Sequence, residues 1–459
     1  MTNRPGPAPL AARQVALDVL REVAHDDAYA NLVLPRRLRA AGLGGRDAAF
    51  ATELTYGSLR RLGSYDAVVA ECAGRPLTRV DDTVLDLLRL GAHQVFFMDV
   101  PNHAAVSTTV DLAKRNRRAS AAGFVSAVMR RMASTPWDQW MDRLAGGLTP
   151  GSDDDLALRL AHPAWLVAGF GEALAADGRP ETDLVDLLTA DNTPAPVTLV
   201  ARPPWSTVDE LLAGGATPCR WSPFGAVLER GDPRSVPAVR ERRAGVQDEG
   251  SQLVAWALTR APLDAPGPER WLDMCAGPGG KAALLASLAT GGAASVQAWE
   301  LHEHRARLVR QQVPSDTVVR VCDAADPEVV GADEAGFDRV LLDAPCSGAG
   351  ALRRRPEARW RKSADDVPRL VAAQSRLLEA ALRLVRPGGV VGYVTCSPLV
   401  AETRAVVEAV ADAAEPLDAR EVMPAGLETG PGPYVQLWPH VHGTDAMFLA
   451  LLRRHPHPR

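Results

Sequence analysis

The chain has 459 residues, enough for about three domains at roughly 150 residues each. Hydrophobic residues make up 46% and charged residues 23%, as in folded soluble proteins, which excludes wholesale disorder and fibrous repeats. The net charge of −5 is uneven, because residues 1–135 carry +5, from 18 basic and 13 acidic side chains.

The first elements along the chain are helical. From about residue 11 to 132 the apolar spacing follows a helix, as in Val15, Val19 and Val23, and predicts an all-helical bundle over residues 1–135. Loop signals near 135–150 predict a domain boundary. Residues 150–235 mix helical periods with short Pro-bounded runs, which predicts a small α+β region.

The pattern changes at about residue 268. Apolar runs at 271–274, 296–299, 318–321, 340–342 and 390–394 alternate with helical segments near 280–290, 302–312, 364–386 and 401–412. This alternation predicts a parallel, doubly wound α/β sheet covered on both faces. We place this domain at 236–459.

A glycine-rich loop joins the first strand to the first helix, where a doubly wound fold binds its ligand. The motif runs from Asp273 to Lys281, and its candidate binding residues are Cys275, Ala276, Gly277, Pro278, Gly279, Gly280 and Lys281. The loop has neither the dinucleotide pattern G-x-G-x-x-G nor the Walker pattern, which disfavours a dinucleotide or nucleoside triphosphate. A tight turn without a ligand is the alternative.

Three acids follow successive strands: Glu300, Asp323 and Asp343. Because parallel strand ends meet at one crevice, these carboxylates are suited to ribose hydroxyls and an adenine amino group. Each acid alone is typical of a helix cap or a solvated loop. Their recurrence after consecutive strands predicts a nucleoside pocket.

Two cysteines close the fourth and fifth strands, Cys346 in Asp-Ala-Pro-Cys-Ser-Gly and Cys396 in Thr-Cys-Ser-Pro. A cysteine at a strand end is often a small buried hydrophobe. Here both lie beside Pro and Ser at the same predicted crevice, which makes a nucleophile plausible. The six cysteines form no CxxC pair, so we predict neither a disulfide framework nor a metal site.

A basic run follows Cys346. Residues 353–362 hold six basic side chains and one acid, with an aromatic ring inside the run. Such a run suits phosphate neutralisation and base stacking, and a solvated loop is the alternative. The RNA-contact candidates are Arg353, Arg354, Arg355, Arg359 and Trp360.

These motifs together resemble the Sun/Fmu family of bacterial 16S ribosomal RNA cytosine-C5 methyltransferases. The N-terminal helices resemble the family's NusB-like RNA-binding domain, and the resemblance spans nearly the whole chain. It implies a NusB-like bundle, a small α+β middle region and a Rossmann-like class I methyltransferase domain. The acid-amide pair that the family often has after the second cysteine appears here as Glu402-Thr403.

The resemblance implies S-adenosylmethionine as cofactor, bound by residues 275–281, Glu300, Asp323 and Asp343. It implies that Cys396 is the nucleophile, that Cys346 assists proton removal and product release, and that Asp343 recognises cytosine. The expected partner is RNA, foremost ribosomal RNA, and we expect a monomer without metal.

Two other functions stay open: methylation of tRNA or another RNA, and a non-catalytic NusB-like RNA-binding or antitermination factor. The start of the chain lacks the apolar core of a signal peptide, and no run approaches 18 apolar residues. We therefore expect a cytoplasmic protein that does not enter a membrane.

Overall fold

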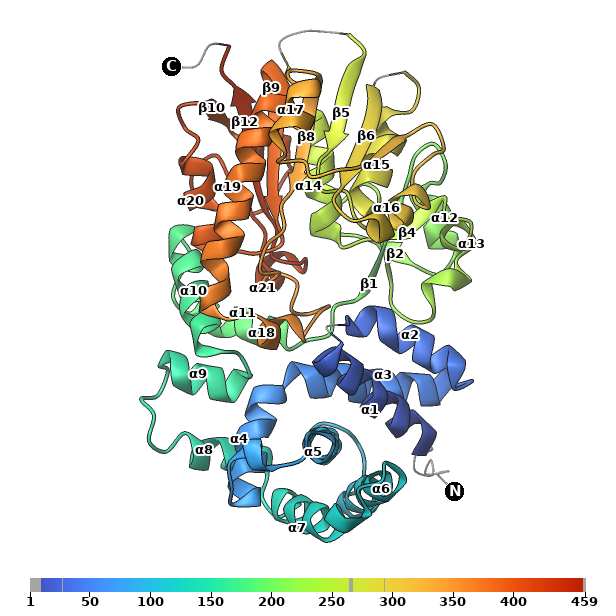
Figure 1. The fold of residues 1–459 in the computed structure, drawn as a ribbon, viewed down its shortest axis with the longest axis vertical. Coiled ribbons are helices and arrows are strands. Elements are labelled where there is room, and N and C mark those ends of the chain that lie inside the picture. The colour runs from blue at the N-terminus through green and yellow to red at the C-terminus, as the bar shows by residue number, and fades with distance from the viewer. Residues whose placement is uncertain (1–9, 27, 264–266, 293, 457–459) are drawn as a thin grey trace. The chain divides into compact units, whose positions relative to one another are not determined.

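The computed structural model describes residues 10–26, 28–263, 267–292 and 294–456. Its contacts group the chain into two compact units (Figure 1). The first takes in residues up to 168 together with 352–361, and the second takes in 169–351 and 362–459. The predicted division into three domains stays a prediction. The N-terminal stretch considered for a signal peptide lies outside the described residues.

The first unit is helical, as predicted; its helices run from blue to teal in Figure 1, except for the later α18, which is orange. Its core is built from the predicted periodic positions, so that Val15, Val19 and Val23 are all buried. Its elements are α1 (Leu10–His25), α2 (Ala30–Ala40), α3 (Gly45–Arg60), α4 (Leu62–Ala73), η1 (Leu77–Arg79), α5 (Asp82–Phe96), α6 (Asn102–Arg115), η2 (Ala119–Ala121), α7 (Ala122–Ala133), α8 (Trp137–Leu144), α9 (Asp153–Leu160) and the later α18 (Ala358–Arg361).

Segment 352–361 belongs to this unit because its side chains bond the carboxyl-terminal carbonyls of the helices. Arg359 donates to the carbonyl oxygens of Arg60 and Ala161, at the ends of α3 and α9. Trp360 donates to Leu59, also at the end of α3. The last turn of a helix has unpaired carbonyls and partial negative charge, so cationic donors stabilise it.

The second unit contains a small antiparallel sheet in the order β2-β3-β1-β4. The sheet begins within the residues predicted as an α+β region, 150–235, and extends beyond them to β4, and that region as a domain stays a prediction. Its elements are α10 (Ala164–Ala176), α11 (Asp183–Asp191), β1 (Val197–Ala201), α12 (Val208–Ala213), β2 (Thr217–Pro218), β3 (Gly225–Leu228), η3 (Pro233–Ser235), α13 (Pro237–Arg240) and β4 (Ala244–Val246).

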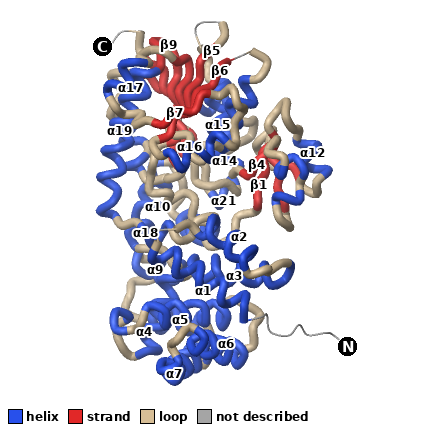
Figure 2. The backbone as a smooth tube through the Cα atoms, turned by 45° about the vertical axis from the view of Figure 1, so that its right-hand side comes forward, coloured by secondary structure: helices blue, strands red, loops and turns tan. Residues whose placement is uncertain are grey.

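The large sheet of the second unit has the order β10-β12-β9-β8-β5-β6-β7, with β11 paired to β12. Its strands are red in Figure 2, where β5, β6, β7 and β9 are labelled. Strands β5 to β9 are parallel, as predicted, whereas β10, β11 and β12 add antiparallel pairs at one end. The elements are α14 (Glu249–Arg260), β5 (Glu269–Asp273), α15 (Gly280–Ala289), β6 (Ala294–Glu300), α16 (Glu303–Arg310), β7 (Val318–Val321), α17 (Pro327–Ala332), β8 (Phe337–Asp343), η4 (Ala364–Asp366), α19 (Val367–Leu384), β9 (Val385–Thr395), η5 (Val400–Glu402), α20 (Arg404–Glu408), β10 (Ala414–Leu417), η6 (Ala419–Val422), β11 (Val435–Gln436), α21 (Pro439–His442) and β12 (Phe448–Arg454).

Both faces of this sheet are buried. Successive strand residues point to opposite faces, so Trp271 and Leu341 pack toward α14 and α15, whereas Leu272 and Leu342 pack toward α19. Continuous apolar runs are therefore required, which explains why the strands are legible in the sequence. The arrangement leaves the carboxyl ends of β5, β6, β8 and β9 at one edge, where the predicted site residues lie.

The sequence predicts no membrane-spanning segment. Within the described ranges, no helix is both long enough and apolar enough to span a bilayer.

Candidate active site

The glycine-rich loop connects β5 to α15, as predicted. Gly279 has φ +112°, and a Cβ there would lie 3.0 Å from the Val309 Cα. A side chain is therefore excluded both by backbone conformation and by space. Glycine at this position therefore allows the chain to turn directly from β5 into α15.

Asp273 ends β5 and is a site residue that the sequence analysis did not single out. Its side chain is 1% exposed, and neither carboxylate oxygen has a hydrogen-bond partner among the described residues. Burial, and then the charge of Asp343, raise the pKa of Asp273 to about 7, and the positive charge of Lys281 offsets this only in part. A buried carboxylate without a donor indicates a place for a cationic or hydrogen-bonding ligand group.

Glu300 ends β6 and is 3% exposed. Its Oε2 accepts a hydrogen bond from the Gly277 amide at 3.0 Å, and its Oε1 accepts one from the His302 amide at 3.1 Å. Arg305 donates to the Gly277 carbonyl at 2.6 Å. Glu300 thus fixes the glycine-rich loop, and its remaining lone pairs are available to hydroxyl donors.

Asp343 ends β8 and forms an ion pair with Lys281, whose Nζ lies 2.8 Å from the Asp343 Oδ2. Burial lowers the pKa of Lys281, but the charge and hydrogen bond of Asp343 outweigh burial, and the net shift is upward. The charge of Cys396 contributes further to this rise. Lys281 therefore stays charged within a largely buried site.

Asp323 lies after β7 and is exposed. Its carboxylate accepts a hydrogen bond from the Ala325 amide at 2.9 Å, as in a local turn. The pKa of the Cys275 thiol is raised by burial and then by Asp273, Asp343 and Glu300. Those three acids thus converge on the loop, while Asp323 sits at the surface of this edge.

The two predicted cysteines meet. Strands β8 and β9 are adjacent and parallel, and the sulfurs of Cys346 and Cys396, just beyond their ends, are 3.4 Å apart. The pKa of Cys346 is raised, first by its hydrogen bond with Cys396 and then by burial. Cys346 is therefore held as a thiol beside its neighbour, an arrangement suited to proton transfer between two sulfurs.

The predicted RNA-contact residues fare differently from one another. Arg359 is fully buried and donates to carbonyls at helix ends, so it is not accessible to RNA. The indole N–H of Trp360 donates a hydrogen bond to the Leu59 carbonyl. Arg353 is buried, Arg354 is half-buried and Arg355 is exposed. The sequence pattern predicted a solvated loop or an RNA contact for this charged run. It did not reveal the capping role, because the helix ends that Arg359 caps, at residues 60 and 161, are far away in the sequence.

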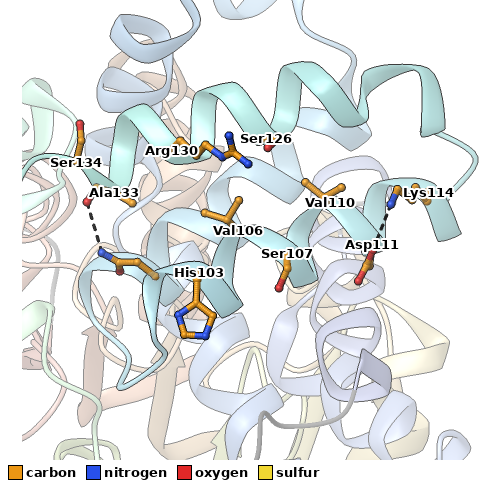
Figure 3. Close-up of a pocket in the computed structure, with 11 residues that line it drawn as sticks. His103, Val106, Ser107, Val110, Asp111, Lys114, Ser126, Arg130, Ala133 and Ser134 are labelled. Carbon is orange, nitrogen blue, oxygen red and sulfur yellow. Dashed lines mark hydrogen bonds and ion pairs between the residues drawn. The ribbon is translucent and has the colours of Figure 1, made fainter.

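A hollow of about 530 Å³ lies between α6 and α7 in the first unit (Figure 3). It is lined by a mixture of polar and small apolar side chains and by Lys114 and Arg130, with Lys114 paired to Asp111 at 3.5 Å. It contains none of the predicted site residues and is not part of the active site.

Two protein-family models match this chain. The family model for 16S rRNA methyltransferase RsmB/F matches residues 261–453, and the NusB family model matches residues 10–134. A Mycobacterium tuberculosis protein described as a methyltransferase is 50% identical over 454 residues, which cover 96% of each chain. The chain belongs to the RsmB/F family of rRNA methyltransferases.

Other relatives agree with this placement. The ribosomal RNA small subunit methyltransferase B of Pseudomonas putida is 33% identical, over 86% of this chain and 88% of its own. The crystal structure of PH0851 has a TM-score of 0.79 at 20% identity and covers 98% of this chain and 100% of its own. The structure of a methyltransferase homolog from Pyrococcus horikoshii has a TM-score of 0.52 at 24% identity, and the match covers 67% of this chain and 100% of the other.

Family membership confirms the predicted fold class and the resemblance. RsmB/F proteins are S-adenosylmethionine-dependent methyltransferases, which confirms the predicted cofactor. The residues present fit it: the unpaired Asp273 carboxylate can accept from an ammonium group, and Glu300 retains acceptor capacity for ribose hydroxyls.

Proposed function

We propose that this RsmB/F family member transfers a methyl group to C5 of a cytosine in RNA, through a covalent adduct between Cys396 and C6 of the base. The observation that supports it is the pair of sulfurs 3.4 Å apart beside the Lys281–Asp343 ion pair. Formation of a covalent intermediate requires one thiol as the nucleophile. Its breakdown requires removal of a proton, and a second thiol at the same site can assist that step.

Cytosine C5 is too weak a nucleophile for direct methylation, so the base requires activation. When the Cys396 thiolate adds to C6, an S–C6 bond forms and the C5=C6 electrons make C5 enamine-like. Bound S-adenosylmethionine supplies the methyl group. C5 takes the methyl group, a base at the site accepts the C5 proton, and the electron pair of the C5–H bond re-forms C5=C6 as the S–C6 bond breaks and its electrons return to the Cys396 sulfur.

Cys346 and Asp343 have separate tasks in this scheme. Cys346 assists removal of the C5 proton and so allows Cys396 to leave. Asp343 hydrogen-bonds the N3/N4 edge of cytosine, whose amino group is a donor that uracil lacks. Lys281 holds Asp343 in place through their hydrogen bond and supplies positive charge to the site. The target base has to leave its stack, so an unpaired site is expected.

Small-subunit ribosomal RNA is the substrate we propose, because the family model and the Pseudomonas putida relative carry that description. We further propose that the protein acts in the cytoplasm, where ribosomes are made. Mapping 5-methylcytosine in RNA from cells with and without the gene tests the proposal. A change confined to tRNA would favour the alternative RNA substrate, and no change in any RNA would favour a non-catalytic binding factor.

Cofactor binding yields one prediction. Glu300→Ala removes two hydrogen bonds that fix the glycine-rich loop and an acceptor for ribose, each about 1–3 kcal/mol for a charged group. We expect affinity for S-adenosylmethionine to fall by about tenfold to a hundredfold in calorimetry. The control is Glu303→Ala, an exposed acid on α16. Equal affinity in both variants and the wild type would remove Glu300 from the site.

RNA binding is proposed to use the exposed end of segment 352–361 and the adjoining start of α2. Tyr29 is 44% exposed, and the guanidinium carbons of Arg355 and Arg361 lie 5.4 Å and 5.1 Å from its ring centre. An aromatic ring with neighbouring guanidinium groups suits base stacking and phosphate contact. This retains the predicted role for Arg355.

A second prediction follows for this surface. Tyr29→Ala combined with Arg355→Ala should weaken RNA binding by about tenfold or more, since a stacked base contributes about 1–3 kcal/mol. Loss of Arg355 should also lower the slope of log affinity against log salt by about one phosphate contact. Filter binding over a salt series measures both. Arg234→Ala, an exposed arginine of the second unit, is the control and should bind as the wild type does.

A further inference from the structure

Glu402 is a buried carboxylate between the two cysteine loops. It is 0% exposed and lies in η5, shortly after Cys396. Its Oε1 accepts from the Ser347 amide at 2.8 Å, and its Oε2 accepts from the Ser347 hydroxyl at 2.5 Å. One carboxylate therefore holds both polar groups of the residue that follows Cys346.

The residue before Cys346 is held from the same side. Gln374 of α19 donates from its Nε2 to the Pro345 carbonyl at 3.0 Å and to the Glu402 Oε1 at 3.0 Å. The backbone on both sides of Cys346 is thus fixed by a single hydrogen-bonded group. The charge of Glu402 also contributes to the raised pKa of Cys346, after the hydrogen bond with Cys396, burial and the charge of Cys396.

The same group reaches the second cysteine. The hydroxyls of Ser347 and Ser397 share a hydrogen bond at 3.1 Å, and Ser397 directly follows Cys396. Tyr393 of β9 donates to the Glu402 carbonyl at 2.7 Å. Each cysteine is therefore flanked by a serine, and the two serines are joined to each other and, through Ser347, to Glu402.

We propose that Glu402 is a positioning residue of the active site, which holds the Cys346 loop against the Cys396 loop so that both sulfurs reach one base. A carboxylate suits the task because it accepts several hydrogen bonds at once. Small displacements in such an arrangement lower the rate strongly. The catalytic use of the pair rests on the proposed function, whereas the geometric role does not.

Disulfide crosslinking measures this geometry without RNA or cofactor. The oxidant diamide takes up the two electrons and two protons that the thiols lose as the S–S bond forms, and mass spectrometry identifies the peptides that hold Cys346 and Cys396. Glu402→Ala removes every acceptor and should slow this crosslink by about tenfold or more. Glu402→Gln keeps the shape and most hydrogen bonds, and should crosslink at close to the wild-type rate.

Glu249 provides the matched control. It is also a buried glutamate, and its Oε1 accepts from the amides of Trp221 and Ser222 at 2.5 Å and 2.7 Å. Glu249→Ala should lower the melting temperature but leave the crosslinking rate unchanged. Wild-type crosslinking in Glu402→Ala would overturn the proposal. If Glu402→Ala does not fold, Ser347→Ala replaces it, and unchanged crosslinking there has the same meaning.

Methylation assays add a separate readout. With methylation established in the wild type, Glu402→Ala should lower the single-turnover rate by about a hundredfold at unchanged cofactor affinity, and Glu402→Gln should restore most of it. A wild type that crosslinks rapidly but methylates no RNA would contradict the proposed function and leave the geometric role of Glu402 supported. Full methylation by Glu402→Ala would overturn that role in catalysis.

Discussion

Cys346→Ala is expected to trap a covalent protein–RNA complex, whereas Cys396→Ala is expected to form none. Cys396 makes the S–C6 bond, so its loss should abolish methylation, by about a thousandfold or more. Cys346 acts after the bond has formed, so its loss should permit methyl transfer but slow release. Each variant is incubated with substrate RNA and S-adenosylmethionine, and the complex is detected by denaturing electrophoresis.

The two sulfurs are 3.4 Å apart, so both can reach the same base. Because Cys396 forms the covalent intermediate and Cys346 assists its breakdown, the two variants should give opposite results. The double variant serves as control and should form no complex. A trapped complex in Cys396→Ala and none in Cys346→Ala would reverse the two roles. Full activity in both single variants would exclude covalent catalysis.

Asp273→Asn should stabilise the second unit above neutral pH while weakening cofactor binding. The folded pKa of Asp273 is about 7 against an ordinary 3.8, so the folded state binds the proton more tightly than the unfolded chain does. The wild type therefore loses stability as pH rises from about 4 to 7, by up to about 4 kcal/mol. Asparagine does not ionise, and this pH-dependent loss should disappear.

Thermal unfolding of both proteins from pH 4 to pH 8 measures the effect, with calorimetry for S-adenosylmethionine. Asp177→Asn is the comparison, because Asp177 is equally buried but hydrogen-bonded to Trp438 and paired with Arg404. That variant should be less stable than the wild type. An Asp273→Asn protein with wild-type pH dependence and cofactor affinity would remove Asp273 from the site.

Much of the second unit was predictable from its sequence because buried parallel strands require continuous apolar runs. The predicted strands at 271–274, 296–299 and 340–342 all lie in the large sheet. Their order places Cys346 and Cys396 at adjacent strand ends, so a topological argument was enough to bring the two residues together. Antiparallel strands β10 to β12 were not predicted, because they are short or lack an adjoining helix signal.

Other features depend on contacts that a sequence pattern does not contain. Asp273 resembles any acid that ends a strand until its burial and its lack of a partner are known. Arg359 resembles its neighbour Arg355 in sequence, yet one is buried and the other exposed. The difference arises from helix ends some 200–300 residues away, at Ala161 and Arg60. Composition shows that cations are present but does not show where they are used.

The capping of helices by segment 352–361 has a consequence for biosynthesis. The helical unit begins to leave the ribosome first, yet the residues that satisfy the ends of α3 and α9 are made after the 183 residues from 169 to 351. Until then those carbonyls lack their cationic donors. Nascent chains stalled before residue 352 should therefore hold a helical unit that proteases cleave more readily than chains stalled after the C-terminus has emerged. Maturation of the first unit therefore awaits translation of residues 352–361, which follow residues 169–351 of the second unit along the chain.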